Sequence, residues 1–315
     1  MNFSAAHVIN PVSLEENEEL FTAQQITVQS MLAAKKYFHL PGNIRLCSIA
    51  KNARSAKCHP EFLVLPNLQR DISDLLPGQR KSLPFLKDIL QAVGNHTNED
   101  YIIYTNLDIA LMPYFYSTIA SYVAQGHDAI IINRRLLHNK FASQKNLNML
   151  YAEAGRVHTG YDCFVVKRSL LSKFILNDIC LGAPPVCNDL FYNIFTFAEN
   201  PILLTDKHIT FHIGFELYKN WGSSAIVKHN YREFYTMLKE LLPHMNISKF
   251  PGADLNLVKR HFKWLMNPTF HYPTMLRLDA KRGFKKSKTK NLAEEFIPTR
   301  KQRYLEWLIQ YINFD

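Results

Sequence analysis

The sequence of 315 residues has no hydrophobic run long enough to cross a membrane. No stretch approaches the roughly 18 consecutive apolar residues that a membrane-spanning helix needs. The first residues also lack the basic and apolar regions of a signal peptide. The five cysteines form neither a CxxC pair nor a zinc-finger spacing, which argues against a disulfide scaffold and a structural zinc site. We therefore expect a reduced, cytoplasmic protein.

Several catalytic signatures are missing as well. The sequence contains no GxxxxGK[ST] phosphate loop, no GxGxxG, no HExxH and no GxSxG. Their absence argues against P-loop enzymes, dinucleotide oxidoreductases, zincins and α/β-hydrolases.

Charge is distributed unevenly along the chain. The formal net charge is +10, and residues 250–315 hold 13 basic and six acidic side chains. Six of the basic residues fall in KRGFKKSKTK at 281–290, which predicts an exposed loop. This loop could be solvated only, or it could bind an anionic membrane surface or nucleic acid. The mild charge of residues 1–249 argues against an extended nucleic-acid-binding face.

The order of predicted elements indicates an α/β fold. Short β-rich runs alternate with helical stretches over the first two thirds of the chain, which is typical of a largely parallel sheet. Strands are predicted at 6–12, 44–50, 62–65, 101–111, 128–133, 161–167, 202–204 and 208–213, and helices at 18–38, 83–93, 113–125 and 188–198. Helices alone follow, at 225–242, 255–265 and 298–314. We expect a domain over 1–215 and a helical C-terminal extension over 216–315.

Polar residues after one buried strand are the first candidates for chemistry. Thr105, Asn106 and Asp108 follow the apolar run YIIY. Ligands of open α/β sheets bind beyond the carboxyl ends of strands. Asp108 with the amide oxygen of Asn106 could hold a divalent cation that bridges to a diphosphate. The alternative is a turn in which these side chains bond their own backbone.

This region resembles glycosyltransferases with the GT-A fold, which use nucleotide-diphospho-sugars. TNLD followed by LMPYFY is similar to the family's DxD region, and GYDCFVVKRSLL is similar to its acceptor-side strand. CNDLF stands where the family has an acidic motif at a helix N-terminus. The resemblance covers about residues 1–215 and implies a mixed, mostly parallel sheet flanked by helices.

The resemblance also implies a metal site with Mn²⁺ or Mg²⁺. Asp108 matches the metal-binding acidic residue of DxD, and Asn106 would face the ribose or the waters of the metal. His212 stands where many members have a further ligand from a late strand, with His208 as the local competitor. A histidine at the end of an apolar strand can also be a packed, hydrogen-bonded residue.

Three carboxylates are candidates for the base that accepts the proton of an acceptor hydroxyl. Asp189 matches the motif position of the base, although an Asp there could instead cap the helix that follows. Asp162 is the second candidate and is better suited to bonding hydroxyls of the sugar or acceptor. Glu153 is the third.

The departing nucleoside diphosphate also needs cations nearby, because negative charge grows on its leaving oxygen. Arg134 and Arg135 emerge from a predicted buried strand and are the candidates, with a solvated surface role as the alternative. The first strand of this fold meets the nucleotide, so the resemblance gives Asn10 a contact to the base or ribose.

The function implied is transfer of a sugar from a nucleotide-diphospho-sugar to a hydroxyl of a saccharide, a lipid-linked molecule or a protein. Asn106 and Asn188 stand at positions where the family has acidic residues. A non-catalytic nucleotide- or glycan-binding protein on the same fold is therefore the alternative. A third interpretation is nucleic-acid binding through the basic tail. Through 281–290 the enzyme could also attach peripherally to a membrane.

Overall fold

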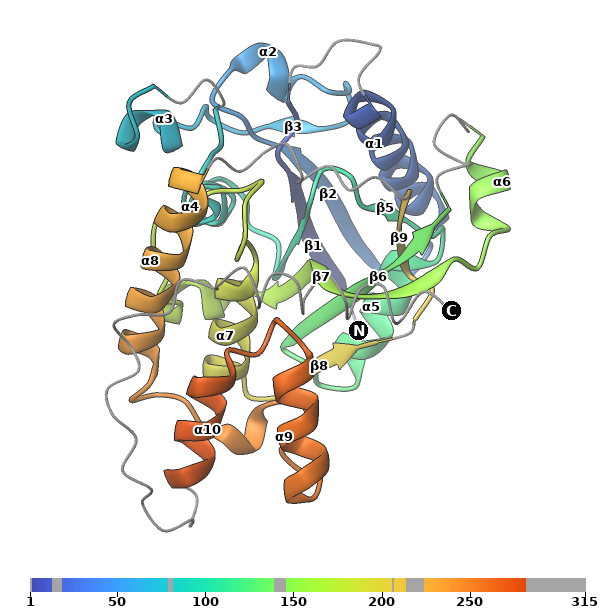
Figure 1. Ribbon diagram of the computed structural model, residues 1–315. Coiled ribbons are helices and arrows are strands. Elements are labelled where there is room, and N and C mark those ends of the chain that lie inside the picture. The colour runs from blue at the N-terminus through green and yellow to red at the C-terminus, as the bar shows by residue number, and fades with distance from the viewer. Residues whose placement is uncertain are drawn as a thin grey trace.

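The computed structural model describes residues 2–12, 19–78, 82–138, 146–205, 207–213 and 224–281. Its described strands form one nine-stranded sheet at the centre of the molecule, with helices around it (Figure 1). The strands are β1 Phe3–Ile9, β2 Gly42–Ser48, β3 Leu63–Val64, β4 Tyr101–Thr105, β5 Ala110–Leu111, β6 Ala129–Leu137, β7 Arg156–Lys167, β8 Pro201–Leu204 and β9 Thr210–Ile213.

The helices separate the strands in the first part of the chain and follow one another at its end. They are α1 Glu19–Tyr37, α2 Ala53–Ala56, α3 Ile72–Leu75, α4 Leu86–His96, α5 Phe115–Ala124, α6 Leu147–Tyr151, α7 Asn188–Phe197, α8 Ser224–Leu241, α9 Leu257–Met266 and α10 Tyr272–Lys281. Short 3₁₀ helices lie at Arg168–Lys173 and Ile247–Lys249.

The sheet is mixed and mostly parallel, which confirms the predicted fold class. Its order is β3-β2-β1-β4-β7-β6-β9-β5, with β8 also paired to β6. The pairs β1–β2, β1–β4, β2–β3, β6–β8 and β6–β9 are parallel. The antiparallel pairs are β4–β7, β6–β7 and β5–β9.

Both faces of the sheet are buried, each in a separate hydrophobic core. Successive side chains of a strand point to opposite faces, so one strand contributes to both cores. In β4, Ile102 and Tyr104 pack into the core that contains α4, α7 and α8. Ile103, from the same strand, packs into the core that contains α1 and α5. Central strands covered on both sides are expected to be continuous apolar runs, as YIIY is here.

The C-terminal helices share the first of these cores. Phe234 on α8, Trp264 on α9 and Met275 on α10 are buried in the same cluster as strand residues of β4, β6 and β7. Phe191 on α7 lies at the centre of an aromatic group there, with its ring stacked on Tyr161 at 5.6 Å between centroids. The predicted domain boundary at 215/216 stays a prediction. Residues within 224–281 share a hydrophobic core with the strands of the N-terminal part of the chain.

The run 101–111, which breaks at polar residues, forms two strands, β4 and β5, at different places in the sheet. Four described helices, α2, α3, α6 and α10, have no counterpart among the predicted helices. The predicted helix at 298–314 and residues 282–290 of the basic run lie outside the described residues. All five cysteines are free. Among the described helices none is both long and apolar enough to cross a membrane.

Replacing Phe234 with alanine tests whether α8 belongs to the core of the sheet. Its side chain is 2% exposed and its ring lies 5.6 Å from that of Tyr192 on α7. We expect Phe234→Ala to lower the free energy of unfolding by about 3–5 kcal/mol in a single urea transition. The exposed Phe262 provides the control, since Phe262→Ala should change stability by less than about 0.5 kcal/mol. Equal effects of the two variants would contradict this packing.

Candidate functional site

A cavity of about 400 Å³ opens where several strands end. Its walls come from the ends of β1, β4, β6, β7 and β9, and from the segments before α4 and before α7. Of the residues predicted for the site, those that line the cavity are Asn10, Asn106, Asp108, Arg134, Asp162 and His212. Residues 82–84 and 181–186 form another part of its wall.

Asp108 and His212 meet at this cavity although they are 104 residues apart in the chain. The Nε2 atom of His212 lies 2.9 Å from Oδ2 of Asp108. The antiparallel register of β5 and β9 explains the contact, because Ala110 pairs with Phe211 and the chain just before β5 therefore approaches His212. The two residues predicted to bind a metal are thus adjacent.

The carboxyl group of Asp108 is kept ionised at the cavity. Burial alone would raise the pKa of Asp108, but His212 and Arg134 together hold it below its ordinary value. The other ring nitrogen of His212, Nδ1, is buried without a hydrogen-bond partner among the described residues. Within that part of the chain no group of three or more His, Cys, Asp or Glu side chains could hold a metal. A cation here would therefore complete its coordination with ligand oxygens and water.

The side-chain amide of Asn106 is hydrogen-bonded and orients Asp162. Its Nδ2 donates to Oδ1 of Asp162 at 2.8 Å, and its Oδ1 accepts from the hydroxyl of Tyr104 at 2.8 Å. The register of β4 with β7, in which Thr105 pairs with Cys163, places the two residues side by side. A carboxylate at position 106 would repel Asp162, so the amide fits this position.

Only the first of the two adjacent arginines lines the cavity. Arg134 forms an ion pair with Oδ2 of Asp162, and its Nε atom is buried without a partner in the described chain. Arg135 donates from Nη2 to the carbonyl oxygen of Gly155 at 2.8 Å and to that of Ala154 from Nε. Alternation along β6 explains the difference, since neighbouring residues of a strand face opposite sides.

The third candidate acid and the competing histidine lie elsewhere. Neither Glu153 nor His208 lines the cavity. Asn10 does, and its Nδ2 donates to the carbonyl oxygen of Ile49 at 2.7 Å, which fixes the side chain at the end of β1.

Asp189 is fully buried and does not line the cavity. It stands in the first turn of α7, where Oδ1 accepts from the backbone N–H of Leu190 at 2.9 Å and Oδ2 has no partner among the described residues. Burial raises the pKa of Asp189 to about 7, against the lowering effect of backbone hydrogen bonds. Its neighbour Asn188 is the residue of this motif that lines the cavity.

Other lining residues carried no sequence signal for function. His158 lies near Arg134 and His212, and burial together with these two groups lowers its pKa to about 3, so its imidazole is neutral. Its Nδ1 accepts from the backbone N–H of Gly160 at 2.8 Å. Pro268 and Thr269 come from the segment after α9, so the C-terminal part of the chain also contributes to the cavity.

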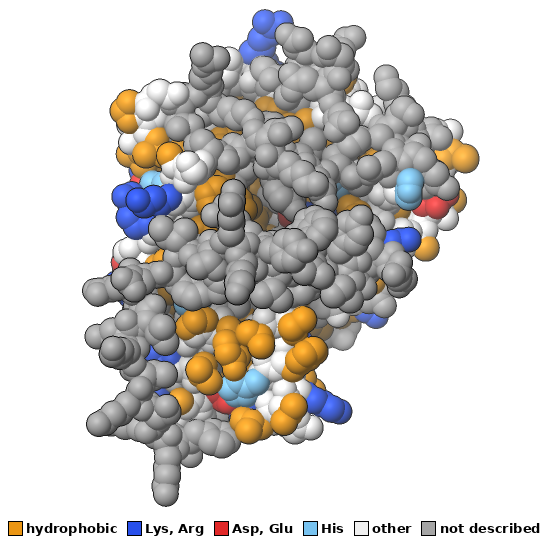
Figure 2. All heavy atoms as spheres, viewed as in Figure 1, with side chains coloured by type: hydrophobic (Ala, Val, Ile, Leu, Met, Phe, Trp, Pro, Cys, Tyr) orange, Lys and Arg blue, Asp and Glu red, His pale blue; other side chains and the backbone are white. Residues whose placement is uncertain are grey.

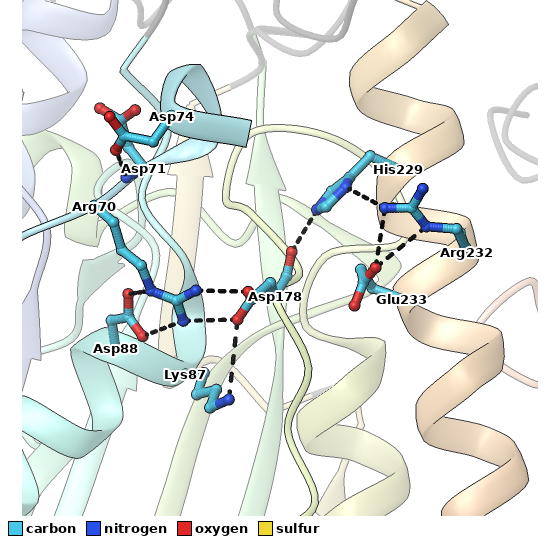
Figure 3. Close-up of polar contacts among 9 residues, drawn as sticks. All are labelled: Arg70, Asp71, Asp74, Lys87, Asp88, Asp178, His229, Arg232 and Glu233. Atoms are coloured by element: carbon cyan, nitrogen blue, oxygen red, sulfur yellow. Dashed lines mark hydrogen bonds and ion pairs between the residues drawn. The ribbon is translucent and has the colours of Figure 1, made fainter. Parts of the chain in front are cut away.

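An ion-pair cluster fixes the wall made by 82–84 and 181–186 (Figure 3). Arg70 donates to both oxygens of Asp88 at 2.8 and 2.9 Å and to both oxygens of Asp178 at 2.6 and 2.7 Å. Asp88 belongs to α4, which follows the first wall segment, and Asp178 precedes the second. His229 on α8 reaches the carbonyl oxygen of Asp178 at 2.7 Å.

Backbone hydrogen bonds join the same two segments. The N–H of Leu86 donates to Ile179 at 3.1 Å and that of Leu181 donates to Pro84 at 2.9 Å. Asn230 on α8 adds hydrogen bonds to both backbone groups of Cys180 at 3.0 Å. This wall therefore depends on contacts from three separate parts of the chain.

The buried carboxyl of Asp189 should make stability depend on pH. Its pKa is raised from 3.8 to about 7 in the folded protein. The folded state therefore holds a proton that the unfolded state releases, and stability falls as the pH rises from about 4 to 7. A tenfold change in proton affinity corresponds to about 1.4 kcal/mol, so this group should contribute a loss of about 4 kcal/mol over that range.

Asp189→Asn should remove that slope, measured by urea unfolding of both proteins across pH 4–8. Asp254 is the control because it is exposed, and Asp254→Asn should leave the pH dependence of stability unchanged. A difference between wild type and Asp189→Asn that does not vary with pH would contradict the assigned burial.

Removing Arg70 should loosen the cavity wall. We expect Arg70→Ala to lower the free energy of unfolding by about 2 kcal/mol, because Asp88 and Asp178 lose their shared partner. Arg277 on α10 is the control, since it is exposed and lies outside this cluster. Thermal and urea unfolding measure both variants. If Arg277→Ala proves as costly as Arg70→Ala, the stabilisation is not specific to this ion-pair cluster.

No protein-family model and no curated protein sequence matches the chain. Solved structures are similar to it in overall arrangement. S. aureus TarS 1-349 in complex with UDP-GlcNAc is 10% identical, with a TM-score of 0.48, over 99% of this chain and 80% of that one. Mannosyltransferase PcManGT from Pyrobaculum calidifontis, in complex with GDP-Man and Mn²⁺, is 13% identical, with a TM-score of 0.46, over 99% and 87%.

A third structure is glucosyl-3-phosphoglycerate synthase from Mycobacterium tuberculosis in complex with Mg²⁺ and UDP. It is 13% identical, with a TM-score of 0.40, over 75% of this chain and 79% of that one. These three likenesses concern the overall arrangement of the chain, at identities of 10–13%.

Proposed function

We propose that this protein is a glycosyltransferase that moves a sugar from a nucleotide-diphospho-sugar to a hydroxyl group, assisted by a divalent cation. The observation that carries the proposal is the 2.9 Å contact between Asp108 and His212 at the cavity. The two were predicted as metal ligands from distant motifs, and a packed histidine would not need a carboxylate partner that faces a cavity.

The donor set fits Mn²⁺ or Mg²⁺ bound together with a diphosphate. Asp108 offers carboxylate oxygens, and His212 offers an imidazole nitrogen. The Nε2 atom of His212 faces Asp108, and its Nδ1 atom has no partner among the described residues. A nitrogen ligand suits Mn²⁺ better than Mg²⁺, which prefers oxygen ligands. When bound, the cation would neutralise the diphosphate of the donor and the charge that grows on it.

Arg134 would hold the leaving diphosphate beside Asp108. It lines the cavity, and its Nε is a buried donor still without a partner among the residues described. Asn10, fixed by Ile49 at the end of β1, would contact the nucleoside. Arg135 bonds the backbone of Ala154 and Gly155 and has no proposed part in donor binding.

Asp162 would meet the acceptor. In the transfer, the acceptor oxygen forms a bond to the anomeric carbon, the bond from that carbon to the diphosphate breaks, and a carboxylate accepts the hydroxyl proton. Asp162 lines the cavity and is oriented by Asn106 and Arg134. Asp189 is buried behind the lining, so we propose that it supports the wall near Tyr104 instead of touching the acceptor.

A non-catalytic binding protein on the same fold is the second candidate. The observation that favours it is that Asn106 and Asn188 carry amides where the resembled family has acidic residues. It predicts that a nucleotide-sugar binds without being consumed, whereas the enzyme also breaks the donor bond, at least slowly with water as acceptor.

The proposed setting is the cytoplasm, with peripheral attachment at a membrane face. Five free thiols suit a reducing compartment. Of the basic run at 281–290, expected to contact an anionic membrane surface, only Lys281 belongs to the described residues.

Metal-dependent nucleotide binding tests the proposal. We expect UDP, GDP or a related nucleoside diphosphate with Mn²⁺ to raise the melting temperature, and EDTA to abolish the rise. Ligand at 100 times its dissociation constant stabilises the folded state by about 2.7 kcal/mol, which is readily detected. Asp108→Asn should lose the metal-dependent part of the shift.

Glu153→Gln is the matched control, because Glu153 is a carboxylate outside the cavity lining, and it should behave as wild type. Donor consumption, followed by release of nucleoside diphosphate, separates the enzyme from the binding protein. A screen in which no nucleotide binds with either metal would overturn both the enzyme and the nucleotide-binding form of the second candidate, and would leave glycan binding as its remaining form.

A further inference from the structure

Helix α9 presents apolar side chains to solvent. Val258 is 77% exposed, Phe262 is 63% exposed and Leu265 is 58% exposed. Their spacing of four and three residues places them on one stripe of the helix. On the face viewed in Figure 2, hydrophobic side chains gather over α9 and α10. Exposed apolar groups of this kind mark interaction surfaces when they are contiguous.

The opposite side of α9 is anchored firmly to the protein. Trp264 is fully buried and donates from Nε1 to the carbonyl oxygen of Pro251 at 3.0 Å. Arg260 and His261 both contact Oδ2 of Asp279 on α10, at 2.8 and 2.9 Å. The outward stripe is therefore held in place and is not a frayed helix end.

Two exposed lysines flank this stripe. Lys259 and Lys263 are exposed on the same helix. Of the described residues, 257–281 contain five basic side chains and a single acidic one, Asp279, which is already paired with Arg260. An apolar stripe flanked by lysines is the pattern of helices that lie in the interface of an anionic bilayer.

We propose that α9 docks on an anionic membrane surface, with Val258, Phe262 and Leu265 inserted among the lipids and the neighbouring lysines on the headgroups. A nucleic acid would match the charge but offers no apolar phase for three large exposed side chains. A second copy of the chain would bring the same positive charge to the contact and would be repelled.

Docking at α9 would place the bilayer beside the cavity. Leu265 is three residues from Pro268, which lines the cavity, so their Cα atoms are at most about 11 Å apart. If the proposed transfer reaction holds, an acceptor carried by a lipid would approach from this side. Vesicle binding itself does not depend on that reaction, so the two proposals can fail separately.

Vesicle flotation of the full chain tests the docking. We expect binding to vesicles of equal parts phosphatidylcholine and phosphatidylglycerol, and none to phosphatidylcholine alone. The double variant Val258→Gln, Phe262→Gln keeps helix propensity and charge. It should bind the vesicles at least about tenfold more weakly than the wild type. Lys259→Ala with Lys263→Ala should weaken binding roughly fivefold for each lysine removed, with a smaller effect at high salt.

Met149→Gln is the matched control, because Met149 on α6 is also exposed and lies outside the cavity lining; it should bind as wild type. Absence of wild-type binding would overturn the proposal, as would binding that the α9 glutamines leave unchanged. A fall in melting temperature of the glutamine variant would show that another part of the chain covers the stripe, which also overturns it. Binding of the wild type to duplex DNA or RNA but not to vesicles would assign the charge to nucleic acid instead.

Discussion

The site depends on one structural constraint, the antiparallel insertion of β7 between β4 and β6. In a wholly parallel sheet the carboxyl ends of neighbouring strands meet at one edge, and each would offer the residues that follow it. Here the start of β7 lies at that edge, so Asp162 stands opposite the end of β4 and next to the end of β6. Asn106 and Arg134 then bind its two carboxylate oxygens.

The short antiparallel pair of β5 with β9 brings together the other two residues of the site, Asp108 and His212. It turns the chain after β4 toward a strand more than 100 residues later and so joins Asp108 to His212. Arg134 links the two parts of the site, since it pairs with Asp162 and also lowers the pKa of Asp108. Burial strengthens these interactions, because charges in a poorly solvated cavity are weakly screened.

Much of this arrangement could be predicted from the sequence, because its signals are local. Buried strands such as YIIY and the change to helices after residue 214 follow from hydrophobic periodicity. Asp108, Asp162 and His212 could be selected because each follows or belongs to a recognisable motif. The resemblance to GT-A glycosyltransferases supplied the roles predicted for them, and the structure shows that they share one cavity.

Other features depend on packing between distant segments, which leaves little trace in sequence. Asp189 and Asn188 are adjacent, and only the rotation of α7 against the core decides that Asn188 lines the cavity while Asp189 is buried. His158 lines the cavity through the extended β6–β7 pairing, which the predicted strand at 161–167 was too short to include. The apolar spacing of α9 is typical of a core-facing stripe, and the structure shows it turned outward.

The most direct test of the central claim is pulsed electron paramagnetic resonance of Mn²⁺ bound to the protein with UDP or GDP. The account predicts nitrogen modulation from the imidazole of His212, lost in His212→Gln, and phosphorus coupling from the diphosphate in the same spectrum. The variant His208→Gln should leave both signals unchanged. Phosphorus coupling without nitrogen modulation, or a signal that His212→Gln does not alter, would contradict a metal-assisted donor site at Asp108 and His212.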